Sequence, residues 1–189
     1  MSVPGKAGTG CGAEEVQVVV ALGSNLGDRE SHLREGVRAL SGFLHVERVS
    51  RIMETPPWGD TEQGPFLNVV VLGRTDRSPR ELMDALLRVE QSQGRLRTRP
   101  GGPRTLDVDL IFHGDAVLRE PGLALPHPRW HLRTFVALPL LEVFPHGTDP
   151  ETGVPLAERV APEVFREPHQ DRGALSGWEA EAGLAKEGK

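Results

Sequence analysis

The chain has 189 residues, is 38% hydrophobic and carries a formal net charge of -5. This composition fits one globular domain and argues against a general nucleic-acid binder, which would carry a basic excess over the whole domain. Its single cysteine, Cys11, excludes an internal disulfide and a cysteine-built zinc site. Since no apolar run approaches the roughly 18 residues of a membrane span, we expect a cytoplasmic protein.

Lysine is confined to the two ends of the chain, at Lys6, Lys186 and Lys189. A phosphate-binding loop of the Gly-x-x-x-x-Gly-Lys type is therefore excluded, and a Schiff-base lysine is not expected. Any phosphate chemistry in the body of the chain must rely on arginine and histidine.

The first half of the chain alternates strand and helix signals. Residues 1–14 are glycine-rich and polar, which predicts a disordered leader. Residues 16–22 are β-branched and almost uniformly apolar, as in a strand covered on both faces. Asp28 can cap a helix with apolar residues at helical spacing, and residues 44–53 suit a second, bulged strand.

A stiff loop, a third strand and a second helix follow. Pro56 and Pro57 fix the loop backbone and display Trp58 near its tip. Residues 66–72 form the third predicted strand, which the polar Asn68 interrupts. Ser78 then begins a capping box for a helix that ends at a glycine before an arginine-rich loop.

A fourth strand over residues 106–112 completes a β-α-β-β-α-β order. This order predicts an α+β fold with a ferredoxin-like βαββαβ core, an antiparallel sheet with both helices on one face. Beyond it we expect C-terminal additions, including a short helix near Phe135 that Pro139 limits or kinks. The predicted domain spans residues 15–165, and residues 166–189 are expected to form a flexible tail.

The fourth strand carries two acids one residue apart. Read with period two, Asp107 and Asp109 share one face, while Leu106, Val108 and Leu110 share the other. An Asp-x-Asp pair is often a merely solvated face, but here cationic residues lie beside it. Such a pair can hold two Mg²⁺ ions, the usual partners of polyphosphate.

Arginine recurs in the loop before this strand, at Arg95, Arg97, Arg99 and Arg104. A solvated charged loop is the simpler interpretation. Against it, four like charges beside an acidic strand repel one another unless an anion compensates them, and the guanidinium fork suits phosphate oxygens. We therefore expect phosphate to bind here, under a loop whose glycines and prolines let it move.

Several other side chains are candidates for ligand contacts. If Asn68 and Phe66 share the open sheet face, the carboxamide offers a donor and an acceptor suited to an amino-oxo heterocycle. Trp58 and Trp130 on proline-rich loops are read as exposed ligand contacts. His127 is either a satisfied loop histidine or part of the site.

These motifs together resemble the 6-hydroxymethyl-7,8-dihydropterin pyrophosphokinase family of folate biosynthesis, over roughly residues 16–165. The resemblance rests on five blocks of sequence, in order: Ala21 to Asp28, Thr55-Pro56-Pro57 with Phe66-Leu67-Asn68, Glu90 to Arg95, Gly102 to Asp109, and Pro126-His127-Pro128 with Arg133 and Phe135. The sequence departs from the family pattern at Gly101, where an aromatic residue is common, and at Phe66, where tyrosine is common.

The resemblance implies transfer of the β,γ-diphosphate of ATP to the hydroxymethyl group of the pterin, with release of AMP. It implies two Mg²⁺ ions on Asp107 and Asp109, and Asp107 as acceptor of the substrate proton. The other implied roles are charge stabilisation by Arg95, Arg97 and Arg104, an ATP site lined by Glu90, Leu110, His127 and Arg133, and a pterin site made by Thr55, Pro57, Trp58, Phe66, Asn68 and Phe135. Its partners would be these small molecules, without nucleic acid or membrane. The sequence leaves the oligomeric state open, with a monomer favoured.

Two other functions share parts of this pattern. A ferredoxin-like RNA-binding module would stack bases on sheet aromatics, yet the first predicted strand has none and the chain is acidic. A two-metal nuclease would also need paired acids, but its product would be cleaved nucleic acid.

Overall fold

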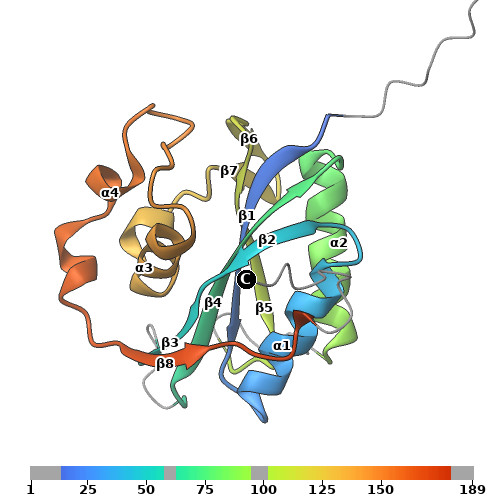
Figure 1. The fold of residues 1–189 in the computed structure, drawn as a ribbon, viewed down its shortest axis with the longest axis vertical. Helices are drawn as coiled ribbons and strands as arrows, with labels where there is room; N and C mark the ends of the chain where they lie inside the picture. The colour runs from blue at the N-terminus through green and yellow to red at the C-terminus, as the bar shows by residue number, and fades with distance from the viewer. Residues whose placement is uncertain (1–13, 58–62, 95–101, 180–189) are drawn as a thin grey trace, which may run out of the picture.

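The computed structural model describes residues 14–57, 63–94 and 102–179. Within these ranges an antiparallel sheet has the strand order β5-β1-β4-β3-β8, and β2 also pairs with β4 (Figure 1). The mixed α/β composition and the antiparallel sheet are confirmed. The elements run in the following order: β1 (Val16–Ser24), α1 (Arg29–Leu40), β2 (His45–Val49), β3 (Arg51–Thr55), β4 (Phe66–Thr75), α2 (Pro79–Ser92), β5 (Asp107–His113), β6 (Leu118–Glu120), β7 (Leu123–Leu125), η1 (Trp130–Leu132), α3 (Thr134–Val143), α4 (Leu156–Arg159), η2 (Pro162–Phe165) and β8 (Gln170–Ala174).

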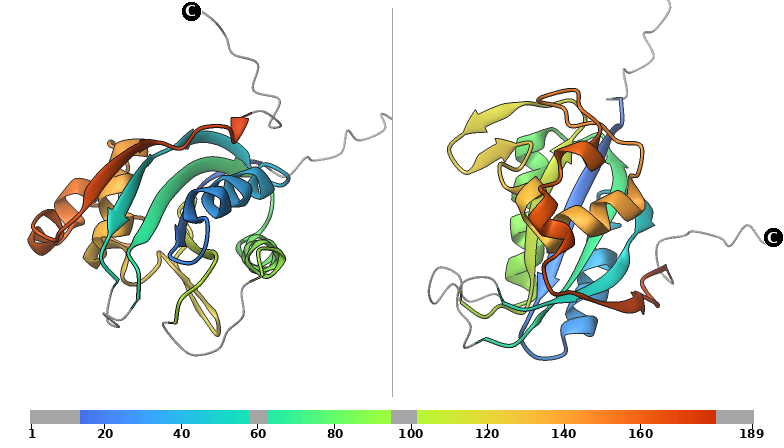
Figure 2. Two further views of the ribbon diagram at one scale, coloured as in Figure 1. Left: turned by 90° about the horizontal axis from the view of Figure 1, so that it is seen from below. Right: turned by 90° about the vertical axis from the view of Figure 1, so that its left-hand side faces the viewer.

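Helices lie on both sides of the sheet (Figure 2). On one side α1 and α2 bury Leu33, Val37, Leu82 and Leu86 against alternate residues of the strands. On the other side α3, α4 and η2 form a second hydrophobic layer. The sequence placed the first two helices on one face and left the opposite face open, whereas α3 covers part of it.

The helix ends follow from local chemistry. The Asp28 side chain accepts a hydrogen bond from the backbone N–H of Ser31, at 3.0 Å, and so satisfies an amide at the start of α1. Ser78 and Glu81 form the predicted capping box of α2. Pro139 lies inside α3 and does not end it, because the helix is held by burial on the sheet, where Val136, Ala137 and Leu140 reach the core.

The second predicted strand is divided. Ser50 separates β2 from β3, and both strands pair with β4. The Ser50 hydroxyl accepts from the backbone N–H of Val70 at 2.9 Å, so a side chain replaces a main-chain acceptor at the break. The β6–β7 hairpin, which has only three residues per strand, was not predicted.

The chain from residue 166 to 179 differs from the predicted flexible tail. Strand β8 pairs with β3, and Arg51 donates to the carboxylate of Asp171 at 2.7 Å. After it, Leu175 and Trp178 are buried in the α1 layer. The residues of β8 are polar and show no alternation of apolar and polar side chains, so the sequence gives no strand signal here. The strand forms because the edge of β3 offers unpaired backbone N–H and C=O groups. Residues 180–189 and the leader 1–13 lie outside the described residues.

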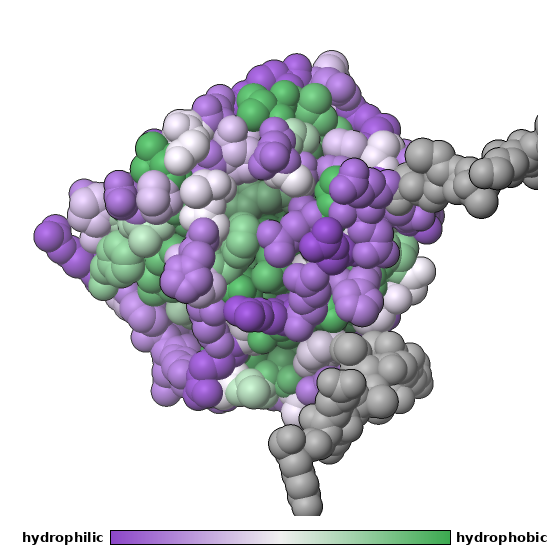
Figure 3. Space-filling model, turned by 45° about the horizontal axis from the view of Figure 1, so that its top comes forward, coloured by the Kyte–Doolittle hydropathy of each residue, from purple (hydrophilic) through white to green (hydrophobic). Residues whose placement is uncertain are grey.

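Hydrophobic side chains are mostly inside these two layers. Figure 3 shows a face that is largely hydrophilic, with hydrophobic atoms visible near its centre and in smaller areas elsewhere. Within the described ranges no helix combines the length and hydrophobicity that a membrane span requires.

Removing the Trp178 side chain should test the contribution of the C-terminal segment. Trp178 is 8% exposed, and we expect Trp178→Ala to lower the free energy of unfolding by about 3 kcal/mol through lost burial and a cavity. The measurement is chemical denaturation. Phe165→Ala is the matched control, because Phe165 is 53% exposed and its loss should change stability by less than about 1 kcal/mol. Equal effects of the two changes would contradict this role of the segment.

Candidate functional site

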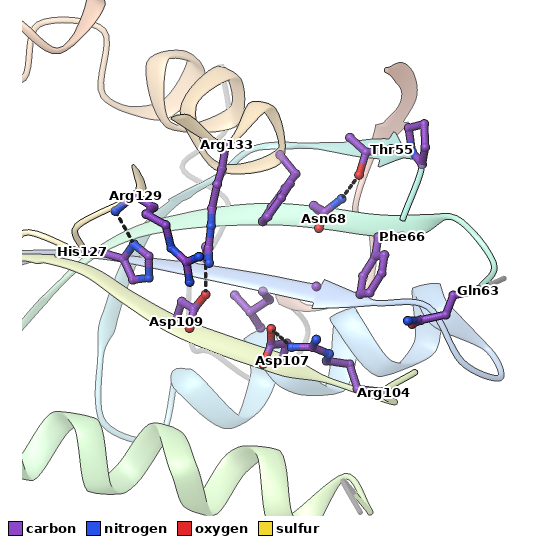
Figure 4. A pocket seen from close by; sticks show the side chains of 15 residues that line it. Thr55, Gln63, Phe66, Asn68, Arg104, Asp107, Asp109, His127, Arg129 and Arg133 are labelled. Atoms are coloured by element: carbon purple, nitrogen blue, oxygen red, sulfur yellow. Dashed lines mark hydrogen bonds and ion pairs between the residues drawn. The ribbon is translucent and has the colours of Figure 1, made fainter. Parts of the chain in front are cut away.

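A cavity of about 420 Å³ opens on the α3 side of the sheet (Figure 4). Its floor comes from β1, β4 and β5. Its walls come from the end of β3, the segments before β4 and β5, the segment around η1 and the start of α3. Among the described residues, the lining comprises Ala21, Leu22, Gly23, Thr55, Pro56, Gln63, Phe66, Asn68, Arg104, Asp107, Asp109, His127, Arg129, Arg133 and Phe135.

The two acids reach the cavity from β5. Asp107 pairs with Gly23 across the sheet and Asp109 pairs with Ala21, so both carboxylates share the cavity face. Val108, between them, points into the α1–α2 layer, as the alternation predicted. Glu90 of α2 accepts the backbone N–H of Val108 at 2.8 Å, and so fixes the start of β5 against the helix.

An arginine pairs with each acid. Arg104 donates to Asp107, and Arg133 donates to Asp109 at 3.2 Å. Each guanidinium also faces an aromatic ring, with Arg104 Cζ 5.9 Å from the centroid of Phe66 and Arg133 Cζ 5.6 Å from that of Phe135. The centre of the cavity is thus a charged cluster of two acids and two arginines, with aromatic rings beside it.

One end of the cavity combines an aromatic ring with a carboxamide. Asn68 Nδ2 donates to Thr55 Oγ1 at 3.1 Å and to the carbonyl of Met53 at 3.2 Å. The donors are therefore used within the protein, which leaves Oδ1 as the acceptor on the cavity side. A Cβ atom on Gly23 would lie 3.0 Å from this oxygen, so glycine keeps the space in front of it open.

The other end is cationic, with His127, Arg129 and Arg133 (Figure 4). Burial lowers the pKa of His127, and the nearby charges of Arg133 and Arg129 lower it further against the opposing effect of Asp109. The backbone N–H of Arg129 donates to Nδ1 of His127 at 3.2 Å. The hydrogen-bond network therefore assigns the proton of the neutral ring to Nε2.

The His127 ring should titrate below its ordinary pKa of 6.5 in the ligand-free protein. We expect an NMR pH titration to give a midpoint under that value, with the resonance assigned by its loss in His127→Gln. Because folding lowers this pKa, protonation of His127 opposes folding, and its contribution to stability is lost as the pH falls from 6.5 through the folded-state value. A midpoint at or above 6.5 would contradict this environment.

The structure brings most of the predicted site residues together. The cavity lining includes nine of them: Thr55, Phe66, Asn68, Arg104, Asp107, Asp109, His127, Arg133 and Phe135. It does not include Pro57, Glu90 or Leu110; the Glu90 side chain is buried behind β5, and Leu110 packs in the α1–α2 layer. Trp58, Arg95, Arg97, Arg99 and Gly101 lie outside the described residues.

Sequence reasoning missed other members of the lining. Gly23, Gln63 and Arg129 contribute to the cavity without having been predicted. Gly23 belongs to the block Ala21 to Asp28 that supports the family resemblance, but no contact was assigned to it, and Arg129 lies two residues after a predicted histidine. Their positions relative to the cavity depend on strand register and loop path, which local patterns do not give.

Trp130 corrects a prediction. The proline-rich neighbourhood suggested an exposed ligand contact, yet its side chain is 1% exposed. Its ring packs edge-on against Phe112 of β5, with 5.3 Å between the centroids. Trp130 therefore anchors η1 to the sheet and holds the flanking residues His127 and Arg133 in place.

Comparisons with known proteins agree with one another. A family model described as 7,8-dihydro-6-hydroxymethylpterin-pyrophosphokinase (HPPK) matches residues 19–145. The chain is 38% identical to a 2-amino-4-hydroxy-6-hydroxymethyldihydropteridine pyrophosphokinase of Aquifex aeolicus, over 75% of this chain and 88% of the relative. It is 41% identical to the enzyme of the same name from a Synechocystis strain, over 71% of this chain and 70% of the relative.

Some longer proteins contain a part that is similar to this chain. A mitochondrial folate synthesis bifunctional protein of Arabidopsis thaliana is 39% identical over 73% of this chain and 25% of that protein. A solved Plasmodium falciparum HPPK-DHPS triple mutant aligns with a TM-score of 0.65 and 12% identity, over 81% of this chain. Because the chain spans 44% of that structure, and the identity is low, this likeness concerns the fold of one part.

Proposed function

The chain belongs to the 7,8-dihydro-6-hydroxymethylpterin-pyrophosphokinase family, and from this membership we propose how its cavity carries out the reaction of that family. It is an ATP-dependent diphosphokinase of folate biosynthesis that transfers a pyrophosphoryl group to hydroxymethyldihydropterin. The observation that carries the residue assignment is the placement of Asp107 and Asp109 between two unlike ends of one cavity. We assign the pterin to the end with Asn68 and the triphosphate to the end with His127.

The pterin end supplies two kinds of contact. Phe66 and Phe135 offer apolar ring faces to a flat heterocycle. The Oδ1 atom of Asn68, whose Nδ2 is occupied by Thr55 and Met53, is suited to accept from the amino and ring N–H groups of the pterin. Gly23 leaves room for the heterocycle edge in front of this oxygen.

The phosphate end supplies positive charge and a neutral donor. Arg129 and Arg133 present planar guanidinium groups at this end, and Arg104 adds a third from the centre of the cavity, where it pairs with Asp107. His127, with its proton assigned to Nε2, would donate to a phosphate oxygen without adding charge. Arg95 and Arg97 are predicted to complete this set and lie outside the described residues.

The donor set fits magnesium shared with a polyphosphate. Among residues 14–57, 63–94 and 102–179, no group of three or more His, Cys, Asp or Glu side chains is arranged as a complete metal site. Asp107 and Asp109 thus supply part of a coordination shell, and Mg²⁺ ordinarily completes its shell with water and phosphate oxygens. When bound there, two Mg²⁺ ions would neutralise charge on the triphosphate.

The cavity residues then orient the two substrates and stabilise the transition state. The hydroxymethyl oxygen of the pterin forms a bond to the β-phosphorus of ATP as the bond from that phosphorus to the α-phosphate oxygen breaks. The hydroxyl proton passes to the Asp107 carboxylate and then to solvent, and AMP leaves. Arg104 and Arg133 stabilise the charge that moves to the leaving oxygen, so positioning and electrostatics account for most of the acceleration.

The reaction is tested by product identity. With Mg-ATP and 6-hydroxymethyl-7,8-dihydropterin, AMP should accumulate in equal amount with the diphosphorylated pterin, as measured by chromatography. Formation of ADP, or nucleotide turnover without the pterin, would refute the assignment. The comparisons give no support to the RNA-binding or nuclease alternatives.

The strand order also supports a finer classification. We propose that β1, α1, β2 with β3, β4, α2 and β5 form the ferredoxin-like core, because β5 and β4 flank β1 in an antiparallel sheet. The segments from β6 onward are then C-terminal additions, of which α3 contributes Phe135 to the cavity.

A further inference from the structure

Asn25 lies immediately after β1 and is 8% exposed. It is hydrogen-bonded to the segment before β5 at two points. The backbone N–H of Arg104 donates to Asn25 Oδ1 at 2.8 Å, and the backbone N–H of Asn25 donates to the carbonyl of Arg104 at 3.2 Å. Arg104 is therefore held by its main chain while its side chain extends toward Asp107.

The opposite side of the same carboxamide faces the segment before β4. Asn25 Nδ2 donates to Gln63 Oε1 at 3.0 Å, and the carbonyl of Gly64 lies at 3.5 Å. The orientation of the amide follows from its partners, because a backbone N–H can only donate and so requires Oδ1 on the Arg104 side. Gln63 is half-buried and lines the cavity beside Phe66 (Figure 4).

One side chain thus joins two segments that serve different substrates in the function proposed above. We propose that Asn25 is a positioning residue, which links Gln63 at the pterin end to the backbone of Arg104 so that both segments keep one relative placement. When ATP binds, the Arg104 guanidinium must move from Asp107 to the phosphates. Because Asn25 holds the main chain of Arg104, only the side chain has to move. A shift of about 1 Å in such a group can lower the rate by about 100-fold.

The test is a double-mutant cycle on kcat, with AMP formation as the assay. Asn25→Ala should lower kcat about 10- to 100-fold in the wild-type background, because Arg104 loses its placement. In an Arg104→Ala background the same change should lower kcat less than about 3-fold, since no guanidinium remains to be placed. Multiplicative effects of the two changes, or wild-type kcat in Asn25→Ala, would overturn the proposal.

A second variant tests the same link without altering Asn25. Gln63→Ala removes an acceptor from a half-buried side chain, so the fold should persist even if Asn25→Ala is unstable. We expect KM for the pterin to rise about 3- to 10-fold and kcat to fall, with the fall in kcat absent when Arg104 is alanine. An unchanged KM and kcat would count against the proposed link.

Ser24→Ala is the matched control. Ser24 precedes Asn25 and is fully buried, and its hydroxyl has no hydrogen-bond partner within the part of the chain that the structure describes, so its loss should leave kcat unchanged. A fall in kcat equal to that of Asn25→Ala would point to general disturbance of this turn and overturn the specific role. Absence of AMP with the wild-type chain would instead refute the proposed function itself.

Discussion

Asp107→Asn and Asp109→Asn are each expected to lower kcat by about 1,000-fold, with little change in melting temperature. Asparagine keeps the shape of the side chain but removes the charge that would hold magnesium and, at Asp107, accept the proton. Losing one such electrostatic group in an active site costs about 100- to 1,000-fold in rate. Steady-state AMP formation at saturating Mg-ATP and pterin gives kcat, and thermal denaturation reports the fold.

Asp115→Asn is the control for these two changes. Asp115 follows β5 in an exposed turn and does not line the cavity. The Asp115→Asn variant should have the same kcat as the wild-type enzyme at each magnesium concentration tested. If Asp107→Asn or Asp109→Asn kept a wild-type rate, the metal role of the pair would be wrong.

Arg104→Ala should lower kcat about 100-fold while changing the Kd for the nucleotide less than about 5-fold. In the ligand-free chain the guanidinium already pairs with Asp107, so binding to ground-state phosphate exchanges one anionic partner for another. The Arg104 guanidinium lowers the activation barrier mainly as charge develops on the leaving oxygen, because a cation already in place there stabilises the transition state. Titration calorimetry with Mg²⁺ and α,β-methylene-ATP measures the affinity, and AMP formation measures kcat.

The control for Arg104→Ala is the same change at an arginine away from the cavity. Arg80 pairs with Glu120 at 2.6 Å on the surface, and Arg80→Ala should leave both kcat and the nucleotide Kd near wild type. A rise in KM for ATP with unchanged kcat in Arg104→Ala would identify Arg104 as a binding residue only.

Local patterns predicted the elements that local chemistry determines. The N-cap of α1 and the capping box of α2 depend on residues three positions apart, and the structure has both. The alternation of β5 also gave the correct faces for Asp107 and Val108. Strand β8 could not be predicted in this way, because its pairing depends on β3, more than a hundred residues earlier in the chain.

In the candidate site, too, features that depend on local sequence were predicted and features that depend on distant contacts were missed. The residue types that suit phosphate, metal and heterocycle were recognised from the sequence, and nine of the predicted residues line one cavity. Gly23 and Gln63 were missed because their roles arise from contacts across the fold: one leaves space beside Asn68, and the other accepts from Asn25. The burial of Trp130 was missed because proline-rich neighbours do not reveal that Phe112 lies beneath it.

The two described tryptophans give the two hydrophobic layers separate optical reporters. Trp130 belongs to the layer under α3, and Trp178 to the layer under α1 and α2. In variants that retain only one of them, fluorescence emission would follow the unfolding of each side of the sheet independently. Coincident denaturation curves would mean that the layer carrying the phosphate-side residues melts together with the α1–α2 layer. Separate curves would mean that it can open while the rest of the sheet stays folded.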